Sequence, residues 1–278
     1  MAVLLAAMSA LVYGCADFLG GKGTRRASTW SVTASSQLVG FATVIVCLPF
    51  VSSSGPTMRD IGLGAIGGIG GGVGVMLLYH ALAHGTMSIV SPVTAVLAAT
   101  VPVVFGLVVF GQRPGLAAIV GIVCAIAAVA LVSISRDGRR DAHVMRTVVW
   151  SIGAGLGFGV FFVFLDRTGD HAGLWPLVGA RPVSIALASV VALRQGDKIL
   201  VTRKAWPMVA AAGAGDMLAN MLFLFASSRG QLAITGVLAS MYPVSTVALA
   251  RVVDHERLRP IQLVGLLVAL LALVLIAL

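Results

Sequence analysis

The chain has 278 residues, of which 59% are hydrophobic and only 10% are charged. Soluble domains carry about 25% charged residues, so this composition excludes a water-soluble protein. The net charge of +9 would suggest nucleic acid in a soluble protein. Here the basic residues stand in short loops between apolar runs, which is typical of membrane orientation, so no nucleic-acid partner is expected.

The apolar runs predict an all-α membrane protein, because each is long enough to cross roughly 30 Å of hydrocarbon. Continuous runs, rather than alternating ones, exclude a membrane β-barrel. Ten transmembrane helices are expected at about 2–21, 30–51, 61–83, 89–110, 115–134, 147–165, 174–193, 206–226, 231–252 and 260–277. The most polar link predicts two five-helix units, 1–135 and 146–278, joined by a connecting loop at 136–145.

The first span carries a carboxylate at Asp17. An ionisable group inside a span is costly and normally faces a protein interior or a water-filled cavity. Two interpretations stay open. Asp17 stands five residues before Lys22, so it could reach the headgroups or cap a loop. Alternatively, it binds a proton or another cation during transport.

The third and sixth spans are rich in glycine. Gly64, Gly68 and Gly72 are spaced by four residues, as are Gly153 and Gly157. This spacing predicts close contact between helix backbones rather than a phosphate-binding loop, since no Lys-Ser/Thr pair follows it. Near the end of the third span, His80 and His84 lie one turn apart, but no further metal ligand is evident, so we expect an interfacial role.

The seventh and eighth spans hold the other candidate charges. Arg181 requires an anion, which Asp17, Asp216 or an anionic substrate group could supply. Asn220 shares a helix face with Asp216. A buried Arg–Asp pair that only locks the helices is an equally weighted alternative. With two acids and one arginine, one acid lacks a permanent partner, and that acid is the better candidate for ion coupling.

Several polar and aromatic residues could line a cavity for an apolar or cationic ligand. Lipid-facing packing is an equal alternative for each aromatic. These candidates are Gln37, Tyr13, Phe158, Phe161, Phe162, Trp175 and Tyr242. Prolines at 92, 102 and 243, in the fourth and ninth spans, could kink the helices and shape a pore or hinge.

The two halves repeat each other. A shift of 145 residues places Tyr13-Gly14 on Phe158-Gly159 and Trp30 on Trp175. The same shift places Arg181 over Ser36, which stands beside Gln37. Because each half has five spans, the second half must enter the membrane in the opposite sense. An inverted repeat of this kind predicts a binding site near the midplane between the halves.

These features resemble the EamA-type branch of the drug/metabolite transporter superfamily. The motifs that carry the resemblance are the aromatic-Gly pairs Tyr13-Gly14 and Phe158-Gly159, the turn residues Gly85 and Gly230, and the signatures Gly111-Gln112-Arg113 and His255-Glu256-Arg257. Gln112 and His255 depart from the family pattern. The resemblance implies transport of a small metabolite, amino-acid-like compound or drug. Small multidrug transporters, distant relatives, use a first-span carboxylate to bind protons, which favours that role for Asp17 by analogy.

Orientation in the membrane is predicted differently by two criteria. Odd-numbered loops, counted by the span they follow, hold most of the basic residues. The positive-inside rule therefore puts these loops in the cytoplasm and both termini outside. The family resemblance suggests termini inside. We favour the first prediction, because the Lys and Arg bias is the physical determinant.

The sequence as a whole predicts a secondary transporter that works by alternating access and can be proton-coupled, without a cofactor. We expect an integral protein of a bacterial inner (plasma) membrane, monomeric or homodimeric, whose partners are the lipid bilayer, a small-molecule substrate and a coupling ion. Import and efflux both stay open. The alternatives are an intramembrane enzyme using Asp17 and Asp216, or a non-transporting membrane subunit.

Overall fold

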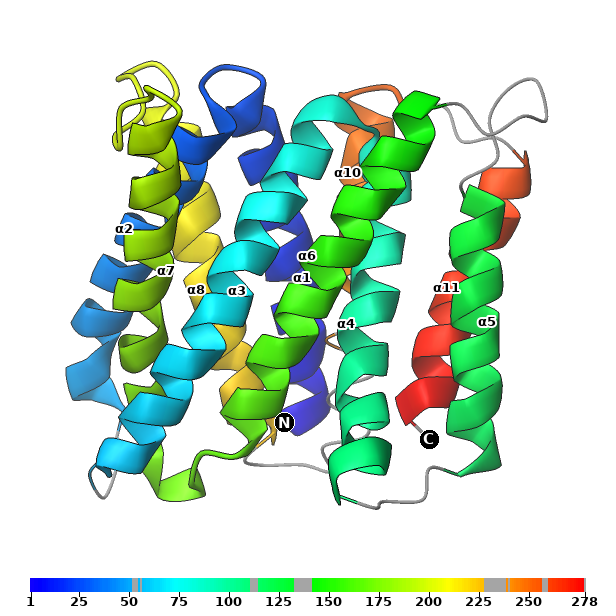
Figure 1. The fold of residues 1–278 in the computed structure, drawn as a ribbon, viewed down its shortest axis with the longest axis horizontal. Coiled ribbons are helices and arrows are strands. Elements are labelled where there is room, and N and C mark those ends of the chain that lie inside the picture. Colours follow the sequence, from blue (N-terminus) through cyan, green and yellow to red (C-terminus); the bar gives the residue numbers. More distant parts are fainter. Residues whose placement is uncertain are drawn as a thin grey trace.

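The computed structural model is a bundle of long helices that lie side by side (Figure 1). It describes residues 1–51, 55, 57–110, 115–132, 142–227, 239, 241–256 and 260–277. The α-helices of this part are α1 (Ala2–Thr24), α2 (Thr29–Cys47), α3 (Met58–His84), α4 (Met87–Phe110), α5 (Leu116–Val132), α6 (Ala142–Asp166), α7 (Trp175–Arg194), α8 (Trp206–Ser227), α10 (Tyr242–Val253) and α11 (Pro260–Ala277). Two short 3-10 turns, η1 (Leu48–Phe50) and η2 (Asp170–Ala172), precede α3 and α7.

Six of these helices have the length and apolarity needed to cross a membrane: α1, α2 continued by η1, α3, α6, α7 and α8. Shorter apolar helices cover Met87–Pro102, Leu116–Ala128, Tyr242–Val253 and Pro260–Leu275. The described residues thus form helices, several of them able to span a membrane, as expected for an all-α membrane protein. Residues 231–238 and 240 of the expected span 231–252 lie outside the described residues.

Side-chain placement on α1 separates a lipid side from an interior side. Leu4, Met8 and Leu11 are exposed and recur every three or four residues, as an outward-facing stripe does. Ala10 and Gly14 are buried against neighbouring helices. At roughly 100° per residue, Asp17 falls on the side opposite the exposed stripe and points towards the bundle.

Glycine allows α3 to pack against two helices of the second half. A Cβ on Gly64 would stand 2.1 Å from the carbonyl oxygen of Pro176, and one on Gly68 2.4 Å from that of Ala180. Another stripe faces α6, where a Cβ on Gly70 would stand 2.7 Å from the carbonyl oxygen of Gly157. The predicted close contact between glycine-rich helices is thus confirmed.

Most helices pack against helices of the other half of the chain. Helix α1 packs against α8 and α10, while α6 packs against α3 and α4. Helix α2 packs against α7 and α8, and α7 packs in turn against α2 and α3. The last described helices of the two halves, α5 in the first and α11 in the second, pack against each other. In this part of the chain, the interior of the bundle is therefore built largely from contacts between halves.

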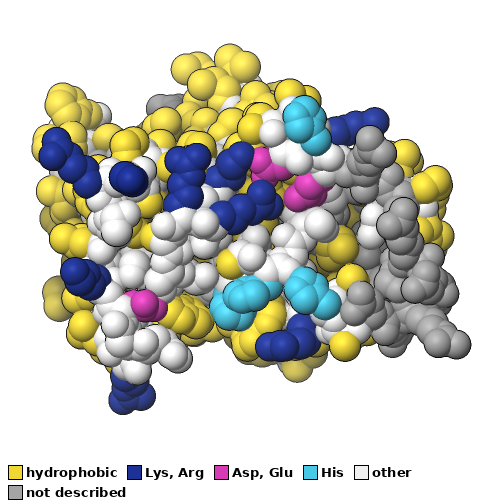
Figure 2. All heavy atoms as spheres, turned by 90° about the horizontal axis from the view of Figure 1, so that it is seen from above, with side chains coloured by type: hydrophobic (Ala, Val, Ile, Leu, Met, Phe, Trp, Pro, Cys, Tyr) yellow, Lys and Arg dark blue, Asp and Glu magenta, His cyan; other side chains and the backbone are white. Residues whose placement is uncertain are grey.

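The two ends of the bundle differ in charge. Both chain termini lie at one end, and α1 starts at the end where α6 finishes (Figure 1). The opposite end carries the loops that follow α1 and α3 and the start of α6. Figure 2 shows this end from above, with many Lys and Arg side chains and fewer acidic ones and histidines. We call it the basic end.

Candidate functional site

The centre of the candidate site is an ion pair between α7 and α8. Arg181 Nη2 donates to Asp216 Oδ2 at 2.6 Å. The arginine side chain is 9% exposed and the aspartate side chain 23%. The anion that pairs with Arg181 is therefore Asp216, one of the candidates named from the sequence.

Gln37 from α2 completes the surroundings of the guanidinium. Its Oε1 accepts hydrogen bonds from Arg181 Nη1 and from Ser184 Oγ, the latter at 3.0 Å. Gln37 and Ser184 are both buried. Gly40, one turn after Gln37, leaves room for the arginine, since a Cβ there would stand 3.3 Å from Arg181 Nη1. Arg181 is thus held by one residue from each half of the chain.

Asp17 lies near this pair but is not part of it. The residue is partly buried, and it makes no hydrogen bond or ion pair within the described part of the chain. It interacts electrostatically with Asp216, whose like charge repels its own. Of the two acids proposed from the sequence, Asp216 is paired and Asp17 is the one without a partner among the described residues.

The protein's three tyrosines interact electrostatically with one or both of the two acids. Tyr13 and Tyr79 interact with both Asp17 and Asp216, and Tyr242 interacts with Asp17. The rings of Tyr13 and Tyr242 lie 6.2 Å apart between centroids. These hydroxyl-bearing rings come from α1, α3 and α10, so the surroundings of Asp17 are drawn from both halves.

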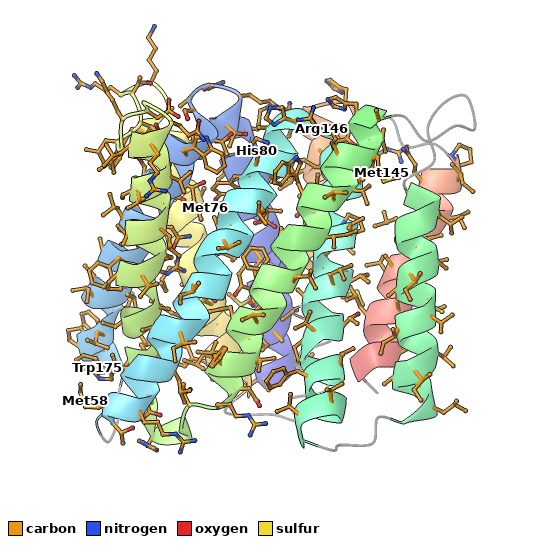
Figure 3. All side chains as sticks on the ribbon, in the orientation of Figure 1. Met58, Met76, His80, Met145, Arg146 and Trp175 are labelled. Carbon is orange, nitrogen blue, oxygen red and sulfur yellow. The ribbon has the colours of Figure 1, made fainter. Side chains whose placement is uncertain are left out.

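Three other predicted residues lie in different settings. The Asn220 side-chain amide donates to the backbone carbonyl of Asp216 at 2.8 Å, so it sits directly beside the ion pair. Phe158 packs into the tight contact between α6 and α3, where a Cβ on Gly74 would stand 2.8 Å from its ring. Trp175 begins α7 and lies at the end of the bundle away from His80 (Figure 3).

His80 belongs to an aromatic cluster near the basic end. It stacks on Trp30 with ring centroids 5.5 Å apart and meets Trp150 edge-on at 4.9 Å. His84 lies 4.4 Å from it, ring to ring. Within the described residues, no group of three or more His, Cys, Asp or Glu side chains could hold a metal ion.

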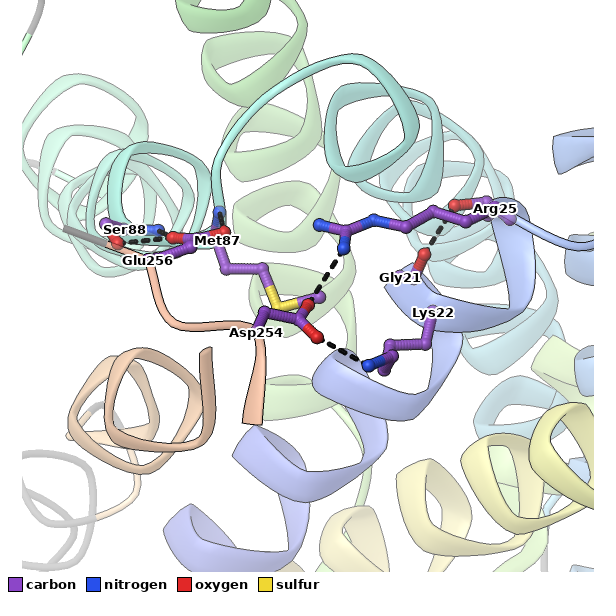
Figure 4. A network of polar contacts seen from close by, with 8 residues as sticks. Gly21, Lys22, Arg25, Met87, Ser88, Asp254 and Glu256 are labelled. Atoms are coloured by element: carbon purple, nitrogen blue, oxygen red, sulfur yellow. Dashed lines mark hydrogen bonds and ion pairs between the residues drawn. The ribbon is translucent and has the colours of Figure 1, made fainter. Parts of the chain in front are cut away.

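The signature residue Glu256 makes a structural contact at the basic end. Its carboxylate accepts hydrogen bonds from the backbone N–H groups of Met87 and Ser88 at 3.1 and 3.2 Å, and from Ser88 Oγ at 2.5 Å (Figure 4). It thereby supplies partners for the free N–H groups at the start of α4. Its counterpart, the segment 111–113, lies outside the described residues, as does Gly230.

Two residues of the site were missed from the sequence. Ser184 stands one turn after Arg181, and that spacing on an amphipathic span could have indicated it. Tyr79 precedes His80, and its ring occupies the space left by Gly20, where a Cβ would stand 2.4 Å from the ring. No local sequence pattern predicts that contact, because it joins α1 to α3.

Comparison with known proteins identifies the family. The sequence profile described as the EamA-like transporter family matches residues 1–134 and 145–278. The chain belongs to this family. As a helical EamA-like protein with six clear membrane-span candidates, it is an integral membrane protein. The resemblance inferred from the sequence is confirmed.

Solved structures with a similar fold add to this EamA-like assignment. Eighteen chains match, and one crystal structure, named only "Crystal structure of protein", has a TM-score of 0.67 to this chain. It covers 99% of this chain and 95% of its own, at 14% sequence identity. At that identity the likeness shows the fold alone. None of the curated proteins compared matches the sequence.

Proposed function

We propose that this EamA-like protein is a ten-span secondary transporter that moves a small metabolite, amino-acid-like compound or drug by alternating access. A proton gradient drives it through Asp17. The observation that carries the proposal is a carboxylate with no partner in the described part of the chain, beside a closed Arg181–Asp216 pair. An unpaired ionisable group inside a membrane bundle destabilises the fold, so its presence indicates a functional role.

Packing between the halves supports an inverted repeat. Gly14 and Gly159 are equivalent positions, and each lacks a Cβ at a contact with the other half. A Cβ on Gly14 would meet the carbonyl oxygen of Tyr242 in α10, and one on Gly159 would meet Val101 in α4. Helices α1 and α6 also run in opposite senses (Figure 1). Transporters with such repeats bind substrate between the halves and alternate by moving one half against the other.

The charges of the site favour a cation as the coupling ion. Arg181 already has its carboxylate, so the set formed by Asp17, Arg181 and Asp216 carries one net negative charge when all three ionise. Binding one proton at Asp17 would neutralise the set. Neutralisation lowers the cost of closing the site away from water during a change of access. The proton is therefore the simplest coupling ion that fits this arrangement.

The same geometry argues against a carboxylate dyad that would catalyse a reaction in the membrane. Acids in such a dyad share a proton, so both must be free. Asp216 is instead bonded to Arg181. Transport is therefore proposed rather than catalysis.

A transport measurement tests the proposal. Proteoliposomes containing wild type or Asp17→Asn would be incubated with a mixture of amino acids, amines and other small metabolites, and their uptake followed by mass spectrometry across a range of pH. We expect at least one compound to be transported by wild type with a rate that depends on pH, and the Asp17→Asn variant to lose that dependence. An unchanged pH profile in the variant would contradict the role of Asp17.

A further inference from the structure

Gln37 occupies an unusual position relative to the ion pair. Arg181 and Asp216 both belong to the second half of the chain, on α7 and α8. Gln37 belongs to the first half, yet its Oε1 accepts from the same guanidinium. Among the described residues, Gln37 is the group from the first half that is hydrogen-bonded to Arg181.

The backbone is shaped to let Gln37 reach that position. A Cβ on Gly213 would stand 2.2 Å from the carbonyl oxygen of Ser36, so α2 and α8 touch directly beside Gln37. Gly40 permits the same approach one turn later, with a Cβ position 3.3 Å from both Arg181 Nη1 and the Gly213 carbonyl oxygen. Two glycines thus bring the amide of one half against the charge pair of the other.

A second donor from α7 reaches the same oxygen of Gln37. Ser184 Oγ donates to Gln37 Oε1, and Ser184 lies on α7 one turn after Arg181. Both donors converge on one oxygen, which a neutral amide can accept without adding charge. With Nη1 held by Gln37, the other arm of the planar guanidinium is directed at Asp216.

We infer that Gln37 is a positioning residue that holds Arg181 on Asp216 and so leaves Asp17 as the single titrating acid of the site. The inference rests on the proposed coupling role of Asp17. It also predicts that the ion pair can be moved. A carboxylate at position 37 would lie where Gln37 Oε1 already meets the guanidinium, and could replace Asp216 as the partner of Arg181.

Other ionisable groups near Asp17 do not alter this charge count. The helices packed against α1 contribute Asp216 from α8, Tyr79 from α3 and Tyr242 from α10. Tyr13 lies on α1 itself, and Arg181 from α7 interacts electrostatically with Tyr13. The tyrosines are neutral when protonated, so the charge of the set is decided by two acids and one arginine.

Three variants change that count in different ways. Asp216→Asn leaves Arg181 without a carboxylate, so its charge stabilises ionised Asp17 and the protonation of Asp17 is suppressed. Gln37→Glu adds a second acid in excess of the arginine, so one more carboxyl must take up a proton. The double variant Gln37→Glu, Asp216→Asn moves the pair across the halves and returns the set to one acid in excess.

Infrared difference spectroscopy during a pH titration reads these states directly, because a protonated carboxyl has its own C=O band. The samples would be full-length protein in vesicles, and the Asp17 band would be assigned as the one lost in Asp17→Asn. We expect Asp216→Asn to lose the Asp17 band, Gln37→Glu to gain a second carboxyl band, and the double variant to recover the single Asp17 band. A purely structural role for Gln37 would not restore that band.

The control is Gln195→Glu, which makes the same chemical change at an exposed position at the end of α7. It should add its own band without changing that of Asp17. Thermal unfolding confirms that each variant is folded, and if Gln37→Glu unfolds, the comparison of Asp216→Asn with the double variant still decides the matter.

The possible failures are distinguishable. An Asp17 band that Asp216→Asn leaves unchanged, or that the double variant fails to recover, overturns the role of Gln37 while the coupling role of Asp17 stands. No Asp17 band in wild type overturns the inference. If all the expected bands are seen but no compound is transported, the proposed function is overturned and the role of Gln37 stands.

Discussion

The acidic side chains in the interior of the bundle and those at its basic end differ in whether they are paired. At the basic end, Asp254 pairs with Lys22 at 2.5 Å and with Arg25 at 2.9 Å, and Glu256 binds the start of α4 (Figure 4). In the interior, Asp216 is paired with Arg181, but Asp17 has no partner among the described residues.

The difference indicates which acids hold the structure and which one is available. Water and lipid headgroups near the basic end could solvate an unpaired acid at little cost, yet the acids of Figure 4 are partnered there. In the interior an unpaired acid is far more costly, yet one is present. We interpret the paired acids as scaffold and Asp17 as the group that changes state, and the following predictions test that contrast.

The largest effect on stability is expected from breaking the interior pair. Asp216→Asn leaves the buried guanidinium of Arg181 without its counter-charge, which should lower the free energy of unfolding by about 3 kcal/mol. Thermal unfolding of the purified protein in detergent measures the loss. The double variant Arg181→Met, Asp216→Leu removes both charges and should recover most of it. A double variant as unstable as the single one would show that the ion pair is not the cause.

A smaller loss is expected from widening the contact between the halves. Gly68→Val places side-chain atoms where a Cβ already stands 2.4 Å from the carbonyl oxygen of Ala180. Overpacking of this kind costs about 2 kcal/mol. Gly62→Val, on the same helix with nothing within 4 Å of its Cβ position, is the matched control and should cost little. Equal unfolding temperatures for the two variants would refute close packing at Gly68.

At the basic end, removing the partner of α4 should have a moderate effect. Glu256→Ala takes away the acceptor of the Met87 and Ser88 N–H groups. Loss of a helix cap costs about 1 kcal/mol. Hydrogen exchange at the start of α4 measures the expected local fraying, and Glu256→Gln should show less of it. Unchanged protection in Glu256→Ala would mean that the cap contributes nothing.

The smallest effect is expected at the partly exposed ion pairs. Asp254→Asn should lower the free energy of unfolding by about 0.5 kcal/mol: its carboxylate is only 7% exposed, but its partners Lys22 and Arg25 are 24% and 42% exposed and stay solvated without it. The difference from wild type should shrink at high salt, which screens such charges. Unfolding temperatures at low and high salt measure both. A loss as large as that of Asp216→Asn would erase the contrast between the two regions.

Much of the fold follows from the sequence, because apolar runs and glycine spacing are local signals. Apart from α10, which is described only from Tyr242, the helices lie close to the expected ranges, and the glycines of α3 contact α6 and α7 as their spacing predicted. The need of Arg181 for an anion was also evident, since a lone charge inside a bundle must be paired. Which acid would pair was open, because it depends on how α7 and α8 pack.

Contacts across the halves could not be read from the sequence. The shift that aligns the halves set Arg181 over Ser36, beside Gln37, but the hydrogen bond to Gln37 arises only from the contact of α2 with α7 and α8. The same shift equated Trp30 with Trp175. Trp30 stacks on His80 near the basic end, while Trp175 lies near the opposite end (Figure 3). Opposite ends are what an inverted repeat predicts for equivalent positions, so this part of the arrangement does follow from the sequence.

The central claim is that a proton on Asp17 links transport to a pH gradient, and concentrative uptake tests it most directly. For a compound transported by wild type, a pH gradient would be imposed across proteoliposomes containing either wild type or Asp17→Asn. We expect wild type to accumulate the compound above its equilibrium level and Asp17→Asn to reach equilibrium only. Accumulation by Asp17→Asn equal to that of wild type would contradict the account.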